Sequence, residues 1–225
     1  MIEIMKDKLI FALFFVGLGF VTLQVPINTI AGSNVKFTAF DLFAPISGAF
    51  LGIFWGIVSV LAMQIVNIIF HGANFDRATL IRLIPTLFAV WFFARKEGRL
   101  LFIPAISILA FNLHPVGRSV WFYSLFWLIP FLVWPFREKS LVARSLGATF
   151  TAHSVGGAMW IWAIGLPANV WISLIPIVAL ERSIFALGIS ASYILMNNVL
   201  AFLSARKIIP KSVGFDKRYI LTNLI

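Results

Sequence analysis

Residues 37–67 read FTAFDLFAPISGAFLGIFWGIVSVLAMQIVN. An acid, Asp41, stands at the start of an apolar run that is then cut by Gly48, Gly52 and Gly56, at steps of four residues. On a helix, steps of four bring all three glycines to one face. In a bilayer such a face lets two helices approach closely, because packing decides helix association there. The stretch therefore predicts two membrane helices that pack along a seam of glycines.

The second of these helices is expected over residues 56–70, after a tight reversal at Trp55 and Gly56. Its polar residues Gln64, Asn67 and His71 recur at three and four positions, so they share one face. Polar groups that face hydrocarbon without partners are costly. We therefore expect this face to look into protein or into a wet cavity.

The composition is that of an integral membrane protein. Of the 225 residues, 61% are hydrophobic and 12% are charged, with a mean hydropathy of +0.99. A soluble domain carries about 25% charged residues, so this chain could not cover a surface that faces water. We expect residues 1–225 to form a single integral membrane domain, multi-pass in the cell membrane and surrounded by the lipid bilayer. The absence of cysteine excludes disulfides and thiolate catalysis.

The net charge of +10 is distributed along the flanks of the apolar segments. Most of the 18 lysines and arginines lie near the N-terminus, at 95–99, at 137–144 and at 206–218. Basic flanks are enriched on the cytoplasmic side of membrane proteins. This bias predicts that both termini are cytoplasmic and that residues 208–225 form a basic cytoplasmic tail. We expect no nucleic-acid partner.

The apolar segments predict an all-α, polytopic transmembrane bundle of about six to eight helices. Eight crossings are expected at about 9–26, 38–54, 56–70, 79–94, 100–113, 119–136, 146–164 and 177–205. Segment 100–113 is shorter than the roughly 20 residues of a full span, so a six-crossing bundle with a re-entrant pair stays open. Residues 27–37 are expected as an external loop, and residues 166–176 as a segment at the outer face or re-entering the membrane.

Under this topology, the other ionisable residues fall toward the outer side. They are Lys36, Asp41, His71, Asp76, Arg77, Arg82, His114, Arg118, Glu181 and Arg182, with His153 nearer the middle of the membrane. Ionisable residues at membrane depth are rare because they are expensive. The set predicts an outward-open polar pocket, and its excess of arginine over acid favours a ligand with carboxylate or phosphate groups.

The candidate substrate-binding residues share this location. They are Asn34, Asp41, Asn67, Arg82, Arg118, His153, Trp160, Glu181 and Arg182. Three of the basic residues, Arg82, Arg118 and Arg182, are expected to hold an anion. The two asparagines are expected to orient the solute, and Trp160 is expected to pack against it.

Each candidate also has a structural interpretation. Asp41 could stabilise the positive end of a helix dipole, and Arg82 could pair with Asp41 or Glu181. His153 could be a satisfied core histidine. Glu181 and Arg182 are adjacent and point about 100° apart on a helix, so we do not expect them to pair with each other.

No motif predicts catalysis, a metal or a cofactor. The sequence holds no Walker loop, no Gly-x-Ser-x-Gly elbow and no His-Glu-x-x-His run. Three histidines on different helices, without a close pair of carboxylates, are a weak signal for a metal. We therefore expect no catalytic residue, no metal ligand and no cofactor.

Residues 37–67 resemble the second and third helices of the substrate-binding S components of energy-coupling factor (ECF) vitamin transporters. The matching positions are Phe40, Asp41, Leu42, Gly48, Gly52, Trp55 and Gly56, with a polar residue at Gln64. The resemblance implies a pocket near the outer face that is closed by the loop at 27–37. It also implies that this chain has no ATP site and that an ATPase-driven energising module is its partner.

We therefore predict a membrane transport protein that binds a small anionic solute from the outside and mediates its uptake with an energising partner. Two other classes stay open. One is a membrane-embedded enzyme that acts on a lipid phosphate, with His153 or His114 as acid or base and arginines on the phosphate. The other is a membrane scaffold or assembly subunit whose glycine seam packs against another membrane protein.

Overall fold

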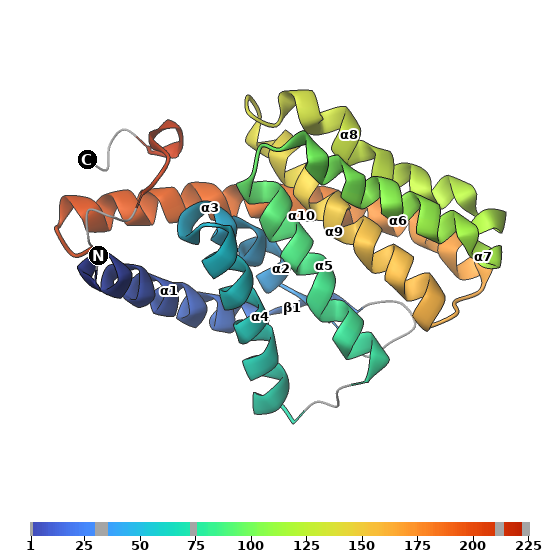
Figure 1. The fold of residues 1–225 in the computed structure, drawn as a ribbon, viewed down its shortest axis with the longest axis horizontal. Helices are drawn as coiled ribbons and strands as arrows, with labels where there is room; N and C mark the ends of the chain where they lie inside the picture. Colours follow the sequence, from blue (N-terminus) through green and yellow to red (C-terminus); the bar gives the residue numbers. More distant parts are fainter. Residues whose placement is uncertain (1, 30–35, 73–75, 210–213, 222–225) are drawn as a thin grey trace.

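The computed structural model shows an all-α bundle with one small β-hairpin (Figure 1). It describes residues 2–29, 36–72, 76–209 and 214–221, with side chains from residue 11 onward. The helices are α1 (Ile2–Leu23), α2 (Phe40–Phe43), α3 (Ser47–Leu51), α4 (Ile53–Phe70), α5 (Arg77–Ala94), α6 (Phe102–Leu113), α7 (Pro115–Ser119), α8 (Ile129–Val133), α9 (Leu141–Ala163) and α10 (Ala168–Ala205). Short 3-10 helices are η1 (Ala44–Ile46), η2 (Gly98–Leu101), η3 (Trp121–Leu128), η4 (Trp134–Phe136) and η5 (Lys217–Tyr219). The predicted all-α class is confirmed.

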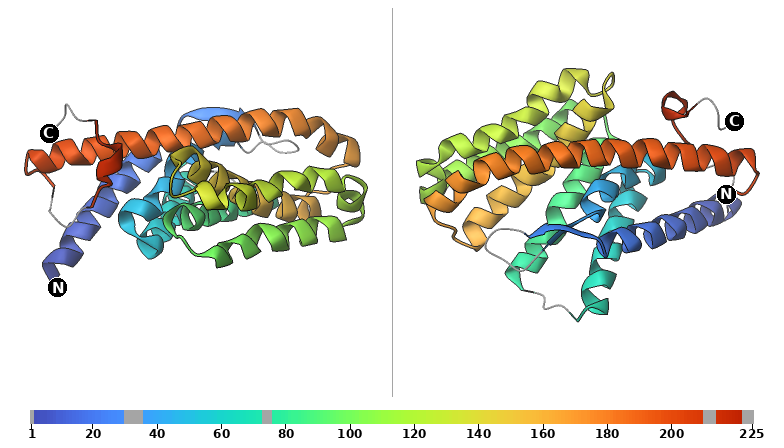
Figure 2. Two further views of the ribbon diagram at one scale, coloured as in Figure 1. Left: turned by 90° about the horizontal axis from the view of Figure 1, so that it is seen from above. Right: turned by 180° about the vertical axis from the view of Figure 1, so that it is seen from behind.

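Helices α5 and α9 form the central pair of the bundle. Helices α6 and α8 pack against α9, while α1, α3 and α4 form the group on the side of α5. Helix α10 crosses behind both groups along the long axis of the molecule (Figures 1 and 2). The start of α1 and the 3-10 helix η5 lie at the same end of this axis (Figure 2).

The expected external loop at 27–37 is in part a β-hairpin. Strand β1 (Pro26–Thr29) pairs antiparallel with β2 (Lys36–Thr38), and Thr29 faces Lys36. Backbone N–H of Ala39 donates to the carbonyl of Val25 at 2.9 Å, which ties the end of the hairpin to the end of α1. Proline stops a helix and favours extended chain before it, so Pro26 ends α1 and opens the strand.

The reversal between α3 and α4 falls at Gly52, so the prediction of Trp55 and Gly56 was wrong. Gly52 has φ of +78°, a conformation that residues with a side chain rarely adopt. Gly48 and Gly56 therefore lie on opposite arms of a hairpin and not on one helix face. A Cβ at Gly56 would lie 2.7 Å from the Cα of Gly48, so the glycines do permit close packing, within the hairpin itself.

Helix α10 corrects the expectation for residues 166–176. From Ala168 these residues are its first turns, and the helix continues through Pro176 for 38 residues, or about 57 Å. Packing of α10 against α9 and α2 supports it along its length. Glu181 and Arg182 therefore lie more than three turns inside a helix, and not near its outer end.

Among the described residues, three helices are long and apolar enough to cross a membrane, namely α4, α5 and α10. Other apolar helical segments are shorter, including Phe40–Leu51, Gly98–Leu113 and Trp121–Phe136. Segment 38–54 was predicted as one helix but is divided into α2, η1 and α3, with Pro45 in the middle turn. Proline lacks the N–H that an α-helix needs, which accounts for the interruption.

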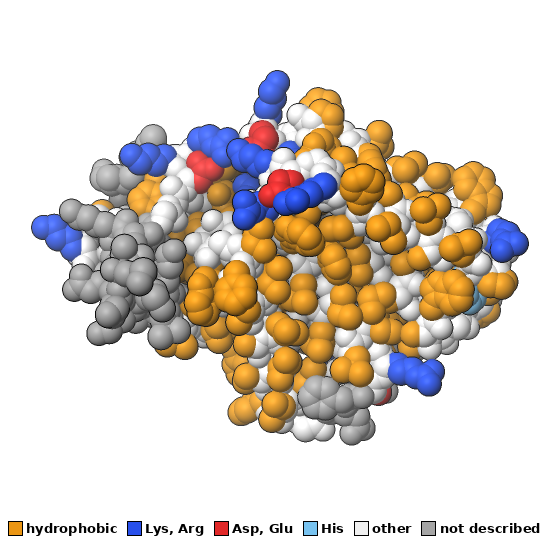
Figure 3. Space-filling view, in the orientation of Figure 1, with side chains coloured by type: hydrophobic (Ala, Val, Ile, Leu, Met, Phe, Trp, Pro, Cys, Tyr) orange, Lys and Arg blue, Asp and Glu red, His pale blue; other side chains and the backbone are white. Residues whose placement is uncertain are grey.

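Apolar side chains cover much of the outer surface (Figure 3). Large exposed examples are Phe54, Phe102, Leu109 and Leu132. Charged side chains gather in contrast at one edge, in the loops after α5 and α8 and in η5 (Figure 3). Lys96 and Glu138 form an ion pair there, and a guanidinium nitrogen of Arg218 donates to the carbonyl of Glu138 at 3.3 Å. We call the loops at residues 95–97 and 137–140, together with η5, the basic edge.

Candidate functional site

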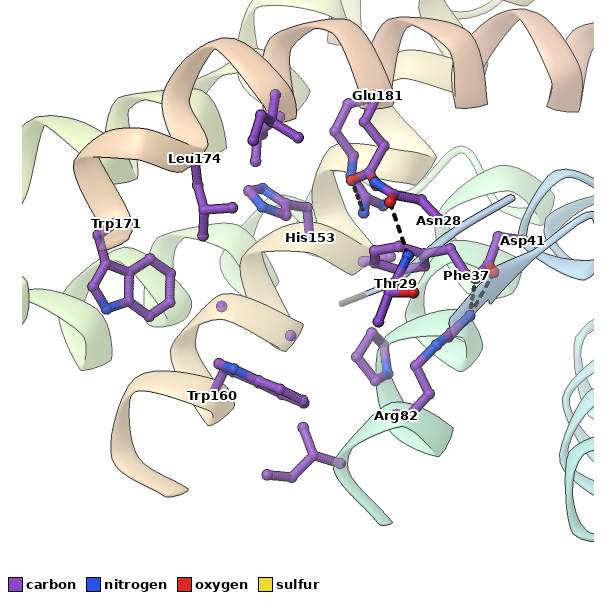
Figure 4. Close-up of a pocket in the computed structure, with 18 of the residues that line it drawn as sticks. Asn28, Thr29, Phe37, Asp41, Arg82, His153, Trp160, Trp171, Leu174 and Glu181 are labelled. Carbon is purple, nitrogen blue, oxygen red and sulfur yellow. Dashed lines mark hydrogen bonds and ion pairs between the residues drawn. The ribbon is translucent and has the colours of Figure 1, made fainter. Parts of the chain in front are cut away.

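A cavity of about 260 Å³ lies between α5, α9, α10 and the β1–β2 hairpin (Figure 4). Its walls come from segments that are far apart in the sequence, so only the tertiary fold creates it. Most of the predicted binding residues line it, namely Asp41, Arg82, His153, Trp160, Glu181 and Arg182.

Of the other three candidates, the two that the structure describes, Asn67 and Arg118, do not line the cavity. Asn34 lies outside the described residues. Asn67 lies on α4, where its side chain accepts a hydrogen bond from Gln24 at 2.9 Å. Arg118 lies exposed on α7, which His114 starts by accepting a hydrogen bond from the backbone N–H of Val116. The sequence analysis placed all these residues toward the outer side of the membrane, but that shared location did not decide which side chains line the cavity.

Asp41 and Arg82 form the first ion pair of the cavity. One guanidinium nitrogen of Arg82 contacts both carboxylate oxygens of Asp41. A second guanidinium nitrogen donates to the hydroxyl of Thr86 at 3.1 Å, and Asp41 also accepts from the backbone N–H of Thr38 at 2.9 Å. The side chains of Arg82 and Asp41 are only 13% and 9% exposed. Of the two acids considered as partners of Arg82, Asp41 and Glu181, the structure pairs it with Asp41.

Glu181 and Arg182 form the second ion pair, so the prediction that they do not pair was wrong. Nη2 of Arg182 lies 2.8 Å from Oε2 of Glu181, and Asn28 of β1 donates to Oε1 at 3.2 Å. Nη1 of Arg182 also donates to Thr149 of α9 at 3.4 Å. Their Cα–Cβ bonds diverge, but both side chains are long enough to bend back into the same cavity.

Phe37 of β2 connects the two ion pairs. Its ring centroid lies 5.0 Å from the guanidinium carbon of Arg82 and 4.6 Å from that of Arg182. Both distances are in the range of cation–π attraction. Phe185 of α10 packs against the same ring edge-to-face at 5.4 Å. The sequence analysis missed Phe37 and Asn28 as site residues, although an aromatic residue in an otherwise polar loop was a usable signal.

His153 is held in the wall by two aromatic residues that the sequence analysis also missed. Trp127 donates from its indole nitrogen to Nδ1 of His153 at 3.0 Å, and Oη of Tyr123 lies 3.2 Å from Nε2. A Cβ at Gly157 would lie 2.5 Å from Cζ2 of Trp127, so glycine is what allows this approach. The structure thus favours the interpretation of His153 as a core histidine whose two ring nitrogens both have hydrogen-bond partners. The glycine pair beside His153 was the signal in the sequence for its tight packing.

The end of the cavity away from the ion pairs is apolar and aromatic. Trp160 of α9 and Trp171 of α10 lie there with Leu174, while Asn28 and Asp41 lie toward the charged end (Figure 4). The two tryptophans are 7% and 2% exposed. Trp171 packs edge-to-face on Tyr123, with 4.9 Å between ring centroids. The cavity is therefore amphipathic along its length.

The charges at the cavity balance. Two arginines face two carboxylates, and each carboxylate contacts a guanidinium. The excess of arginine that the sequence suggested is absent, because Arg118 lies elsewhere and Arg77 does not line the cavity. In the part of the chain that the structure describes, no group of three histidine or acidic residues is placed to hold a metal ion.

The fold and site together define an all-α protein with an apolar exterior and a buried, charge-balanced cavity. No protein-family model and no solved structure matches the chain. It is 26% identical over 201 residues to an uncharacterized protein from Methanocaldococcus jannaschii, a match that covers 80% of this chain and 68% of the relative. The function of that relative is itself uncharacterized, so the similarity supplies no activity.

Proposed function

We propose that this chain is a multi-pass membrane protein that captures a small solute in the cavity and mediates its uptake. One observation carries the proposal: a cavity of about 260 Å³, walled by two largely buried arginine–carboxylate pairs, lies in a chain with apolar outer faces. Buried ionisable groups are costly in a membrane protein and are kept where a ligand or an ion is handled.

The exterior supports a location in the cell membrane. Exposed leucine and phenylalanine side chains cover outer helix faces, and hydrocarbon would cover them without cost. The basic edge brings together the loops after α5 and α8 and the 3-10 helix η5. By the positive-inside bias this edge is cytoplasmic, which places both termini inside. The start of α5, and Arg82 within two turns of it, then face outward.

The hairpin supports entry of the solute from the outside. Asn28 and Phe37 contact Glu181 and the two guanidinium groups, so the hairpin covers the charged end of the cavity. Its displacement would open that end. The sequence holds no familiar ATP-binding motif, and we propose that a partner supplies the energy for uptake. An ATPase-driven energising module, as the resemblance to ECF S components implies, fits this requirement.

Native mass spectrometry of the gently purified protein tests the proposal. We expect a bound small molecule below about 1 kDa in the wild type. It should be lost in Arg82→Ala and retained in Arg118→Ala, because Arg118 is exposed on α7 and lies outside the cavity. Thermal unfolding checks that each variant folds. Arg82→Ala leaves the buried carboxylate of Asp41 unpaired, so Arg82→Lys, which keeps a cation beside it, is used if Arg82→Ala does not fold.

Other outcomes would contradict solute capture. A bound lipid phosphate would favour the membrane enzyme. A stoichiometric protein partner without any small molecule would favour the scaffold. A bound small molecule that persists equally in Arg82→Ala and Arg182→Ala would show that the two ion pairs do not hold it.

A further inference from the structure

The neighbours of His153 allow only one arrangement of its protons. The indole N–H of Trp127 can only donate, and it points at Nδ1 of His153 at 3.0 Å. Nδ1 must therefore accept and carries no proton. A histidine ring with a bare Nδ1 is neutral and carries its proton on Nε2.

The proton on Nε2 determines the role of Tyr123. Oη of Tyr123 lies 3.2 Å from Nε2, so this oxygen accepts the hydrogen bond from the histidine. The hydroxyl proton of Tyr123 is then left to donate to something else. Within the described part of the chain this hydroxyl has no second partner, and Tyr123 lines the cavity. The hydroxyl of Tyr123 is thus a hydrogen-bond donor in the wall of the cavity, because its oxygen already accepts from His153.

Few atoms of the lining residues are free to accept a hydrogen bond from Tyr123. Both oxygens of Asp41 contact Arg82, and the two oxygens of Glu181 are bound by Asn28 and Arg182. The buried polar atoms of lining residues that lack a partner in the described structure are all donors. They are Nε of Arg82, Nε of Arg182, and the indole nitrogens of Trp160 and Trp171.

The charge balance excludes a strong preference for a charged ligand. The ionisable groups of the cavity are two arginines and two carboxylates in contact, beside a neutral histidine. A ligand with a net charge would add a charge that no group in the balanced lining compensates, which is costly where water is partly excluded. An ammonium group would also have to share a carboxylate with the guanidinium that already contacts it.

The size and the aromatic end limit the shape of the ligand. A cavity of about 150 Å³ holds benzene, so by proportion about 260 Å³ holds roughly ten non-hydrogen atoms. Trp160, Trp171 and Leu174 contribute two aromatic rings and an aliphatic side chain at one end. Aromatic rings stack favourably on tryptophan.

We propose that the cavity binds a flat, uncharged aromatic molecule whose hydrogen-bond acceptor receives the proton of Tyr123. This inference rests on the proposed function, because it names the class of solute that the same cavity takes. It replaces the anion that the sequence suggested, since the arginines of the cavity already have carboxylate partners.

Three probes of matched size and different charge test the class: benzamide, benzoate and benzylamine. Titration of the purified protein, followed by tryptophan fluorescence, reports on Trp160 and Trp171 in the wall. We expect benzamide to bind more tightly than benzoate and benzylamine. Tighter binding of either charged probe, or no binding of any probe, would overturn the proposed class. Solute capture would remain testable separately, through the molecule found by native mass spectrometry.

Tyr123→Phe tests the donor. It removes the hydroxyl and keeps the ring, so we expect roughly 2- to 10-fold weaker binding of benzamide, the loss of one neutral hydrogen bond. Tyr193→Phe is the matched control, because Tyr193 is a buried tyrosine of α10 that does not line the cavity, and it should leave the affinity unchanged. Equal affinity of wild type and Tyr123→Phe would contradict the role of the hydroxyl.

Glu181→Gln tests the charge balance without touching Tyr123. It leaves Arg182 without its carboxylate, so the affinity for benzoate should rise relative to the affinity for benzamide. Glu138→Gln removes a carboxylate at the basic edge, outside the cavity, and should leave the ratio of the two affinities unchanged. An unchanged ratio in Glu181→Gln would show that the paired charges do not set the preference.

Discussion

At the scale of the residue, the buried pair of Asp41 and Arg82 links α2 to α5. Asp41 begins α2 and Arg82 belongs to α5, and both are nearly inaccessible to water. A buried pair is worth little when compared with an apolar pair of the same volume, but one partner left alone is a buried, uncompensated charge. We therefore expect this region to be more stable with both charged side chains, or with neither, than with only one of them.

Single and double variants of this pair separate the two effects. Asp41→Asn should destabilise the fold by about 3–5 kcal/mol, because it leaves Arg82 unpaired. Asp41→Asn combined with Arg82→Gln should recover much of that loss. Thermal unfolding of the purified variants measures both effects. Glu97→Gln, in the exposed pair with Arg99, is the control and should change little. A double variant less stable than either single variant would refute this account.

At the scale of the element, the 3-10 helix η5 is docked on α10 by two asparagines. Asn197 accepts from the backbone N–H of Asp216, and Asn198 donates to the carbonyl of Tyr219 at 2.8 Å and accepts from the N–H of Leu221. The basic tail expected at 208–225 thus has, in its described part, a defined position on the helix that precedes it. Its charges belong to the basic edge.

The docking of η5 should depend on pH below about 4. Hydrogen bonds from Arg218 hold the pKa of Asp216 below its usual 3.8. A lowered pKa means that the folded state favours the carboxylate, so this stabilisation is present above pH 3.8 and is lost as the pH falls through the folded pKa. After correction for the intrinsic exchange rate, the amides at 216–221 should therefore be better protected against hydrogen exchange at pH 5 than near pH 3.

Asp216→Asn is the control for that experiment. The variant lacks the titrating group, so the difference in exchange at 216–221 between the two pH values should largely disappear after correction for the intrinsic rate. If the variant keeps the full pH dependence of the wild type, another group controls the docking.

At the scale of the whole molecule, the proposed direction of the chain in the membrane rests on the basic edge. The loop after α5 and the loop after α8 meet there through Lys96 and Glu138. The ends of α6 and α9 meet on the opposite side, where His114 and Trp162 pack edge-to-face at 4.9 Å. These two sets of contacts define two ends of the bundle, one rich in basic residues.

Cysteine labelling tests the orientation, and the natural chain contains no cysteine that would interfere. In intact cells a membrane-impermeant maleimide should label Arg118→Cys, which is exposed at the outer end, but not Lys96→Cys at the basic edge. Lys96→Cys should react once the membrane is permeabilised. Labelling of Lys96→Cys in intact cells, without labelling of Arg118→Cys, would invert the proposed orientation.

Several features of the molecule could be predicted from local sequence. Hydropathy and period identified the helical class, and the positions of α4 and α5 were close to those observed, because a helix is specified by residues within a few turns of one another. Asp41, Arg82 and Glu181 stood out because ionisable residues are rare in apolar sequence. The opposite charges of Asp41 and Arg82 also made their pairing predictable.

Other features depended on contacts between distant segments. The sequence placed the reversal at Trp55 and broke the last helix at Pro176, whereas packing selected Gly52 and carried α10 through the proline. The sequence by itself determined which segments are helical and which residues are costly to bury. Only the tertiary structure decided that Tyr123, Asn28 and Phe37 join the cavity and that Arg118 does not, because side chains meet through the packing of helices and not through their order in the chain.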